Sequence, residues 1–327
     1  MLIFHSRLFR MMRKHSMALM GAGLLILVLM TTAVVATQGE NTPDLLDTRA
    51  AAQKSIAFTR TQELAEYFQQ LDYQWPPSDF SKVPSVTLDA FPEDFSAATT
   101  TQERKSLFLR SLLPIVLLEN RRLREQHNLA KLILENDLPD KGSPTRKWLD
   151  GVAKEMRIRG DLTKESVQQR LLNRLDEIPP ALALAQAAIE SGWGTSRFAS
   201  EGNSLFGQWT YNADKGLEPT ERDADATHFV SAFPNLQASV RAYMRNLNTS
   251  RAYREFRDER ARMRADGEDL SATELAQHLR RYSQRGMEYV QELQKIIASR
   301  TLSALELLPA TMDNLVALFP PQPKEPS

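Results

Sequence analysis

The chain contains no cysteine among its 327 residues, and this absence removes several kinds of chemistry at once. Disulfides, thiolate nucleophiles, cysteine metal sites and lipid attachment through an N-terminal cysteine are all excluded. An excess of charge of one sign is absent too, since 41 lysines and arginines balance 41 aspartates and glutamates. A neutral chain has no long-range field that draws it to nucleic acid, so we expect no nucleic-acid partner.

Histidines and several common catalytic motifs are also scarce or missing. The five histidines are scattered and form no HExxH pair, so we expect neither a metal ion nor another cofactor. The chain has no GxSxG elbow, phosphate-binding P-loop or GxGxxG sequence. Acyl transfer through an elbow serine and nucleotide binding therefore lack support, and carboxyl chemistry becomes the main candidate.

A long apolar run occurs near the start, from Met17 to about Ala36, and basic residues precede it between positions 7 and 14. Basic flanks stay on the inner side of a membrane, so we expect the rest of the chain to be exported to the periplasm. About 20 apolar residues suit an anchor in the inner membrane. The small residues Val34 and Ala36 also suit a cleaved signal peptide, and both alternatives stay open.

Apolar residues at helical spacing predict that most of the remaining chain is helical. The predicted helices cover residues 48–71, 100–136, 146–157, 164–175, 180–190, 236–247, 251–265, 273–282 and 287–299. Pro114 either kinks the second of these or marks its start after a shorter helix. The charged face of that helix, residues 119–131, is predicted to face solvent.

The other segments carry turn and loop signals. Prolines in residues 75–95 predict an extended, loop-like segment. The turn-rich stretch after residue 190 predicts a small irregular lobe, with a hairpin between Trp209 and Phe233. The expected divisions are an N-terminal signal or anchor (1–39), a helical region (40–159), a catalytic domain (160–305) and a proline-rich, disordered tail (306–327).

The most informative motif is AAIESGWGTSRFA, at residues 187–199. It places Glu190 where an apolar helix gives way to the turn residues Ser191, Gly192 and Gly194. A carboxyl group beside so apolar a segment loses solvation in its charged form, which raises its pKa and suits a general acid. The alternative is an ordinary helix end with a glutamate that merely faces water.

Aromatic and amide side chains follow within about twenty residues. They are Trp193, Asn203, Phe206, Gln208, Trp209, Tyr211 and Asn212. Sugar rings pack their C–H faces on aromatic rings and need amide partners for their hydroxyls, so this mixture predicts a glycan groove, with an ordinary core as the alternative. A second catalytic acid could come from Glu218, Glu221, Asp223 or Asp225, or the N-acetyl group of the substrate could take its place.

Three segments resemble the catalytic domain of glycoside hydrolase family 73, the N-acetylglucosaminidases that cut peptidoglycan. They are AQAAIESGWGTSRFA, NSLFGQW and YSQRGMEYVQELQKII, and the resemblance covers about residues 160–300. It implies a mainly α, lysozyme-like α+β catalytic domain with a small β-lobe.

The same resemblance implies roles for individual residues. The glutamate of its ESGWG motif is the general acid, which corresponds to Glu190, and a tyrosine of its closing helical region lines the site, which corresponds to Tyr289. Asn203, Phe206 and Gly207 match the family's motif after the catalytic helix, where Gly207 permits a tight turn near the groove, and Tyr282 is a weaker match for the site tyrosine. With Trp209 and Tyr211 from the aromatic pattern, the substrate-binding candidates are Asn203, Phe206, Trp209, Tyr211 and Tyr282. Asp223 and Asp225 match the family's second acid only by their separation from Glu190 in the sequence. Whether the reaction retains or inverts the anomeric configuration therefore stays open.

These expectations describe a glycoside hydrolase that cleaves peptidoglycan glycan strands next to N-acetylglucosamine, with the inner membrane as its other partner. A lytic transglycosylase is the nearest alternative, because it also needs one glutamate on a lysozyme-like fold. A non-catalytic glycan-binding or scaffolding protein is the alternative from another class.

Overall fold

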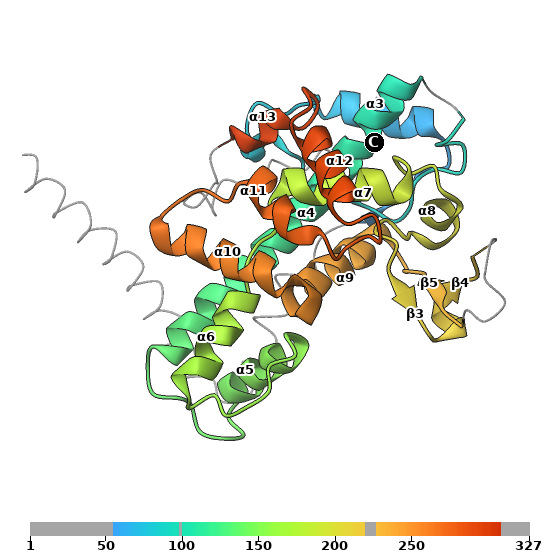
Figure 1. Ribbon diagram of the computed structural model, residues 1–327. Coiled ribbons are helices and arrows are strands. Elements are labelled where there is room, and N and C mark those ends of the chain that lie inside the picture. Colours follow the sequence, from blue (N-terminus) through green and yellow to red (C-terminus); the bar gives the residue numbers. More distant parts are fainter. Residues whose placement is uncertain (1–54, 98–99, 220–226, 309–327) are drawn as a thin grey trace, which may run out of the picture. The chain divides into compact units, whose positions relative to one another are not determined.

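The computed structural model describes residues 55–97, 100–219 and 227–308, which are mainly helical with a few short strands (Figure 1). They lie in the unit Gln53–Ser327. The predicted export segment 1–39 and the tail from residue 309 lie outside the described residues. Across these three ranges, no helix is long and apolar enough to span a bilayer.

The helices match most of the predicted ones in order and approximate bounds. They are α3 (Thr61–Gln70), α4 (Thr101–Leu134), α5 (Pro144–Glu155), α6 (Glu165–Arg174), α7 (Pro180–Ser191), α8 (Arg197–Gly202), α9 (Leu236–Thr249), α10 (Arg254–Asp266), α11 (Ala272–Ala276), α12 (Met287–Ile297) and α13 (Ser303–Glu306). Short 3-10 turns occupy η1 (Phe80–Lys82), η2 (Ala213–Lys215), η3 (Arg251–Tyr253) and η4 (Gln277–Leu279).

Helix α4 runs through the helical body (Figure 1). The Thr100 side chain caps its first turn by accepting a hydrogen bond from the Glu103 amide, which satisfies one free N–H of the helix start. Pro114 is buried inside one continuous helix and does not mark its start. At about 1.5 Å per residue, these 34 residues span roughly 50 Å and so reach both α7 and α6.

The region after α8 is a small sheet. Its strands β3 (Trp209–Thr210), β4 (Gly216–Leu217) and β5 (Phe229–Ser231) are antiparallel in the order β3-β5-β4. The predicted hairpin is therefore three-stranded, with β5 in the middle. A separate two-residue parallel pair joins β1 (Ser55–Ile56), in the segment predicted as helix, to β2 (Thr87–Leu88), in the segment predicted as loop.

One hydrophobic core joins the predicted helical region to the predicted catalytic region. Helix α4 packs against α7 and α9, and the buried residues of all three belong to the same cluster. The predicted boundary between the helical region and the catalytic domain, at residues 159–160, stays a prediction from the sequence. In the fold, residues on both sides of it bury each other's apolar surface, so the N-terminal helices help to support the segment that carries Glu190.

Three local expectations need correction. The helix predicted over 48–71 begins only at Thr61 in its described part, after strand β1. The helix predicted over 273–282 ends at Ala276 and continues as a 3-10 turn. The charged face 119–131 is not uniformly solvated, because Glu119 is 1% exposed and accepts hydrogen bonds from Arg241 at 2.8 and 2.9 Å. Its partner comes from α9, far along the chain, so helical spacing alone could not reveal it.

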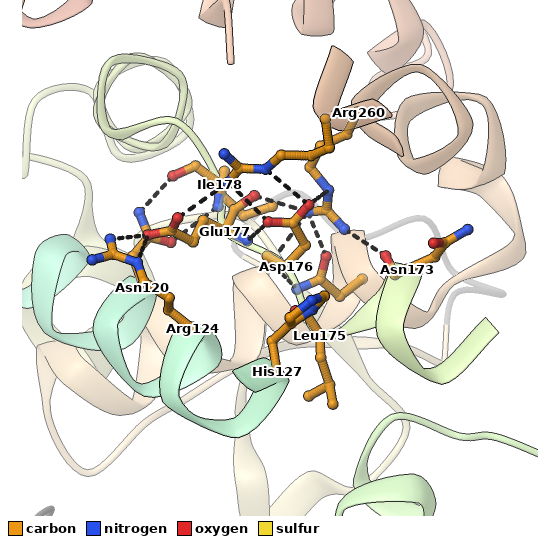
Figure 2. Close-up of polar contacts among 11 residues, drawn as sticks. Asn120, Arg124, His127, Asn173, Leu175, Asp176, Glu177, Ile178 and Arg260 are labelled. Carbon is orange, nitrogen blue, oxygen red and sulfur yellow. Dashed lines mark hydrogen bonds and ion pairs between the residues drawn. The ribbon is translucent and has the colours of Figure 1, made fainter. Parts of the chain in front are cut away.

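The connection between α6 and α7 is held by charged and polar side chains from two other helices (Figure 2). The guanidinium of Arg260, on α10, is buried and donates to the carbonyl oxygens of Asn173 and Glu177 at 2.9 Å each. From α4, the Asn120 amide exchanges two hydrogen bonds with the backbone of Ile178, at 2.7 and 3.0 Å. These contacts fix the chain immediately before the helix that ends at Glu190.

Candidate active site

Helix α7 places Glu190 at its last turn. Pro179 and Pro180 stand at the start of the helix. The first amide hydrogens of a helix have no partner within it, so the N–H groups that proline lacks are not missed there. It ends at Gly192, whose φ of +58° is a left-handed cap, and the Trp193 amide donates back to the Ala188 carbonyl at 2.9 Å. The helix therefore stops just after Glu190, and the carboxyl group lies at the boundary between the apolar helix and the turn.

The turn after Glu190 is fixed by the N-terminal helical region. Gly194 also has a positive φ of +79°, and an added Cβ would lie 3.1 Å from the rings of Phe91, Phe95 and Phe108. The ring of Trp193 meets Phe108 edge to face at 5.7 Å. Because no larger residue fits against these rings, the glycine allows the motif to pack directly on α4 and its preceding segment.

A chain of hydrogen bonds runs from the core to Glu190. The Tyr243 hydroxyl, on α9, donates to Gln186 Oε1 at 2.8 Å, and Gln186 Nε2 donates to the Tyr289 hydroxyl at 2.8 Å. Since the Tyr289 oxygen accepts from Gln186, its own O–H is free to donate to the Glu190 carboxylate, with which it is hydrogen-bonded. Tyr289 is fully buried on α12, so its hydroxyl is held in one direction.

The environment of Glu190 moves its pKa upward. Burial is the largest cause, because it disfavours the charged carboxylate. The hydrogen bond from Tyr289 and the positive charge of Arg285 act in the opposite direction, and the negative charge of Glu292 adds to the rise. The net shift keeps more of the carboxyl group protonated near neutral pH, as a general acid requires.

A second segment approaches the acid from the loop after α8. Gly207 has a φ of +59°, and a Cβ at this position would lie 3.2 Å from Glu190 Oε2. The neighbouring Phe206 carbonyl accepts a hydrogen bond from the Tyr282 hydroxyl at 3.0 Å. Tyr282 in turn stacks on Tyr289, with ring centroids 5.6 Å apart and planes 4° from parallel. The loop and the two tyrosines therefore form one wall beside Glu190.

This close approach predicts that Gly207→Ala lowers activity. The methyl group requires the carboxyl group to shift, and we expect a loss of roughly tenfold or more in kcat/KM on a glycan substrate. The left-handed backbone adds a stability cost of about 1–2 kcal/mol. Gly267→Ala is the matched control, because Gly267 has a φ of +71° and no atom within 4 Å of an added Cβ. Equal activity losses in the two variants would contradict the proposed contact with Glu190.

The structure divides the predicted sugar contacts into exposed and buried groups. Trp209 and Tyr211 lie in the small lobe with 60% and 79% exposure, and Trp209 stacks on His228 at 4.1 Å. Both rings are accessible to a ligand. Asn203 is half-buried and donates to the Phe233 carbonyl at 3.2 Å, so its amide nitrogen holds the loop.

The structure does not place Phe206 and Tyr282 as the predicted substrate-binding residues. Phe206 is 2% exposed and stacks on Tyr243 at 3.9 Å, so its ring belongs to the core and is withdrawn as a sugar contact. Tyr282 is half-buried, with its hydroxyl on the Phe206 carbonyl, and it supports the wall of the site. Asp223 and Asp225 lie outside the described residues.

Sequence reasoning missed Gln186, Tyr243, Arg285 and Glu292. Gln186 had a visible signal, since it is the one amide in the apolar run ALALAQAAI and stands four residues before Glu190, on the same helix face. Tyr243 had none, because its contact with Gln186 spans 57 residues. Glu292 is ion-paired with Arg285 at 2.7 Å, so this second acid near Glu190 is already neutralised by a cation.

Comparison with known proteins finds a matching family model and a curated relative. A family model described as mannosyl-glycoprotein endo-beta-N-acetylglucosaminidase matches residues 168–302, the range that holds Glu190, Gly207 and Tyr289. The protein named bax of Escherichia coli strain K12 is 32% identical over 205 residues, which cover 60% of this chain and 72% of that protein. No solved structure matches the chain.

Proposed function

The chain belongs to the glucosaminidase family, as a relative of the bax protein, and on that premise we propose that it hydrolyses the glycan strands of peptidoglycan. The bond cleaved is the β-1,4 linkage next to N-acetylglucosamine. Glu190 is the general acid that protonates the departing glycosidic oxygen. The observation that carries the proposal is the half-buried Glu190 carboxyl group, with a raised pKa and a tyrosine hydroxyl fixed on it.

The arrangement around Glu190 supports a lysozyme-like mechanism. A helical body holds the acid, and the small sheet beside it presents the exposed rings of Trp209 and Tyr211 to the apolar faces of sugars. Protonation of the glycosidic oxygen lets the sugar leave while positive charge develops at the anomeric carbon. Tyr289 positions the carboxyl group during this step, because its hydroxyl is itself fixed by Gln186.

A second group must attack or stabilise the anomeric carbon. Glu292 lies close enough to influence Glu190, but its ion pair with Arg285 makes it a poor base. Two routes supply the group: Asp223 or Asp225 activates a water, or the substrate's N-acetyl oxygen attacks first and water then opens the ring that forms. Both end with a hydroxyl on the anomeric carbon and a proton on the leaving sugar.

A lytic transglycosylase is the second candidate, because that reaction needs only one acid. In the described site, Glu190 is the one acid without an ion pair at the end of the tyrosine relay, the hydrogen-bonded chain Tyr243–Gln186–Tyr289. Digestion of purified peptidoglycan by the full-length chain, followed by mass spectrometry of the soluble fragments, separates the two. Hydrolysis adds one water and leaves a reducing N-acetylglucosamine end. Anhydro-sugar ends would instead show that the protein is a lytic transglycosylase. Retention of the protein on peptidoglycan without released fragments would show that it is a binding or scaffolding protein.

The apolar run at residues 17–36 completes the proposal. A peptidoglycan hydrolase must reach the wall, so we propose that the chain acts in the periplasm, on the outer side of the inner membrane. Fractionation of cells that express the full chain tests the location separately from the activity.

A further inference from the structure

Helix α5 and its connection to α6 lie apart from the end of α7 and from the small sheet (Figure 1). A broad hollow is lined by α5 and by the residues on either side of it. It measures about 730 Å³ and is open to solvent. Its lining residues lie between positions 141 and 162, so Glu190 and the residues of the tyrosine relay are not among them. Catalysis at Glu190 therefore leaves this hollow without a role.

The lining of the hollow is rich in cations. Five basic side chains contribute to it: Lys141, Arg146, Lys154, Arg157 and Arg159. Only two acids accompany them, Asp150 and Asp161. Asp150 pairs with Arg146 at 3.0 Å, and among the residues that the structure describes the other four cations have no ion pair. The hollow thus carries net positive charge, although the formal charge of the whole chain is zero.

The backbone that carries Arg157 and Arg159 is held in place from behind. Arg174, on α6, donates to the carbonyl oxygens of Met156 and Arg157 at 2.7 and 3.0 Å. Arg170 donates to the Arg159 carbonyl at 2.9 Å. A turn clamped in this way loses little further freedom when a ligand binds, so its two arginines are pre-organised.

The clamp brings further positive charge to the same place. Burial, followed by the charges of Arg170 and Arg157, lowers the pKa of the Arg174 guanidinium. Arginines that are close enough to disfavour one another's charge repel, and an anion in the hollow relieves that repulsion. The crowding of like charges behind the turn is therefore a second reason to expect an anionic ligand.

The mixture of charges selects the class of ligand. Phosphate polymers offer only acceptor oxygens, which Asp161 in the lining would repel. Peptides with several carboxylates offer anions for the lysines and arginines together with N–H donors for the acids. We propose that this hollow, the α5 groove, binds an acidic peptide through Arg157, Arg159 and the neighbouring lysines. The inference rests on the proposed function, since peptidoglycan carries short peptides with free carboxylates.

The test measures binding in a protein that cannot cut. Fluorescein-labelled tetraglutamate is titrated into the full-length Glu190→Gln chain, alone and with Arg157→Gln/Arg159→Gln added. Arg251→Gln/Arg300→Gln is the matched control, because it removes the same charge from two exposed arginines outside the groove. Thermal melting checks that all three proteins fold alike.

The groove variant is expected to bind tetraglutamate at least about tenfold more weakly than its parent, and the control variant to bind as the parent does. Added salt should weaken binding by the parent, and labelled tetraglutamine should not bind. Equal binding by the groove and control variants would overturn the proposal. Displacement of tetraglutamate by tripolyphosphate at lower concentration than by unlabelled tetraglutamate would assign the groove to phosphate polymers instead.

Cleavage is scored separately, so the two proposals can fail independently. With Glu190 intact, the groove variant should cut peptide-free glycan chains at the unaltered rate and show a raised KM on intact peptidoglycan. An unaltered KM on intact peptidoglycan would remove the link between groove and substrate. Absence of cleavage by the unaltered chain on either glycan would refute the proposed function, whatever the peptide measurements show.

Discussion

Glu190→Gln is expected to lower the rate of fragment release from peptidoglycan by roughly 10²- to 10⁴-fold, because the amide keeps the shape of the side chain but has no acidic proton to transfer. The hydrogen bond from Tyr289 can still be accepted by the amide oxygen, so the fold around α7 and α12 should persist. Release of soluble fragments is the measurement, and circular dichroism confirms the fold.

Glu288→Gln is the matched control for this substitution. Glu288 is exposed in the first turn of α12, one residue before Tyr289, and is not among the side chains that shift the pKa of Glu190. It loses the same charge close to the same site. Similar losses in the two variants would show that the site responds to net charge, and digestion by Glu190→Gln at the unaltered rate would remove Glu190 from the reaction.

The pH profile adds a readout that a structural role would not move. Activity needs Glu190 protonated, so it should fall as pH rises through the raised pKa of this group. Tyr289→Phe removes a hydrogen bond that favours the carboxylate, which raises that pKa further. The alkaline limb of kcat/KM should therefore move to higher pH in Tyr289→Phe, even while positioning suffers and the maximum falls. A limb that moves to lower pH would contradict this.

The parts of the site that lie close together in sequence were predictable. The apolar run before Glu190 and the glycines after it indicate a helix that ends at an acid, and α7 ends at Ser191 with Gly192 as its left-handed cap. Long helices such as α4 were predictable for the same reason, since apolar spacing and the Thr100 cap are local signals. Such features depend on neighbours within a turn or two.

The parts that depend on distant partners were not predictable in this way. Phe206 follows the acid as an aromatic in a polar loop, which suits a sugar contact, but Tyr243 from α9 covers its ring. Glu119 looks like one of many surface charges on α4 until Arg241 packs on it. Helix α8 has only six residues, too few for a periodic pattern to stand out. In each case, tertiary packing decides the role of a residue whose local signal is ambiguous.

The largest expected effect on stability lies before α7. Arg260→Met is expected to lower the free energy of unfolding by about 3–5 kcal/mol, because it leaves several carbonyl oxygens buried without their donor and removes one of the two cations that pair with the Asp176 carboxylate. Arg260→Lys should recover only part of the loss, since an ammonium cannot reproduce the planar fork that reaches Asn173, Glu177 and Asn248 together. Urea unfolding followed by circular dichroism measures both.

The control is two residues away on the same helix. Arg262 contacts three acids, Glu259, Asp266 and Glu268, at 2.7 to 3.1 Å, but it is 45% exposed whereas Arg260 is 1% exposed. Exposed ion pairs contribute little, so Arg262→Met should leave the urea midpoint nearly unaltered, although Arg262 has three acidic partners and Arg260 has one. Equal destabilisation by the two variants would mean that the number of ion pairs matters more than burial.

The buried cluster also predicts how stability depends on pH. Burial by itself raises the pKa of Asp176, but Arg260 and Arg264 outweigh it and hold the pKa below its ordinary value of 3.8. A carboxylate with a lowered folded-state pKa stabilises the fold above its unfolded-state pKa, and that contribution is lost as the pH falls toward the folded-state value. Arg260→Met removes the main cause of the lowering, so the difference in unfolding free energy between parent and variant should shrink below about pH 4. A difference that stays constant down to acid unfolding would show that packing around the guanidinium, and not its charge on Asp176, holds the start of α7.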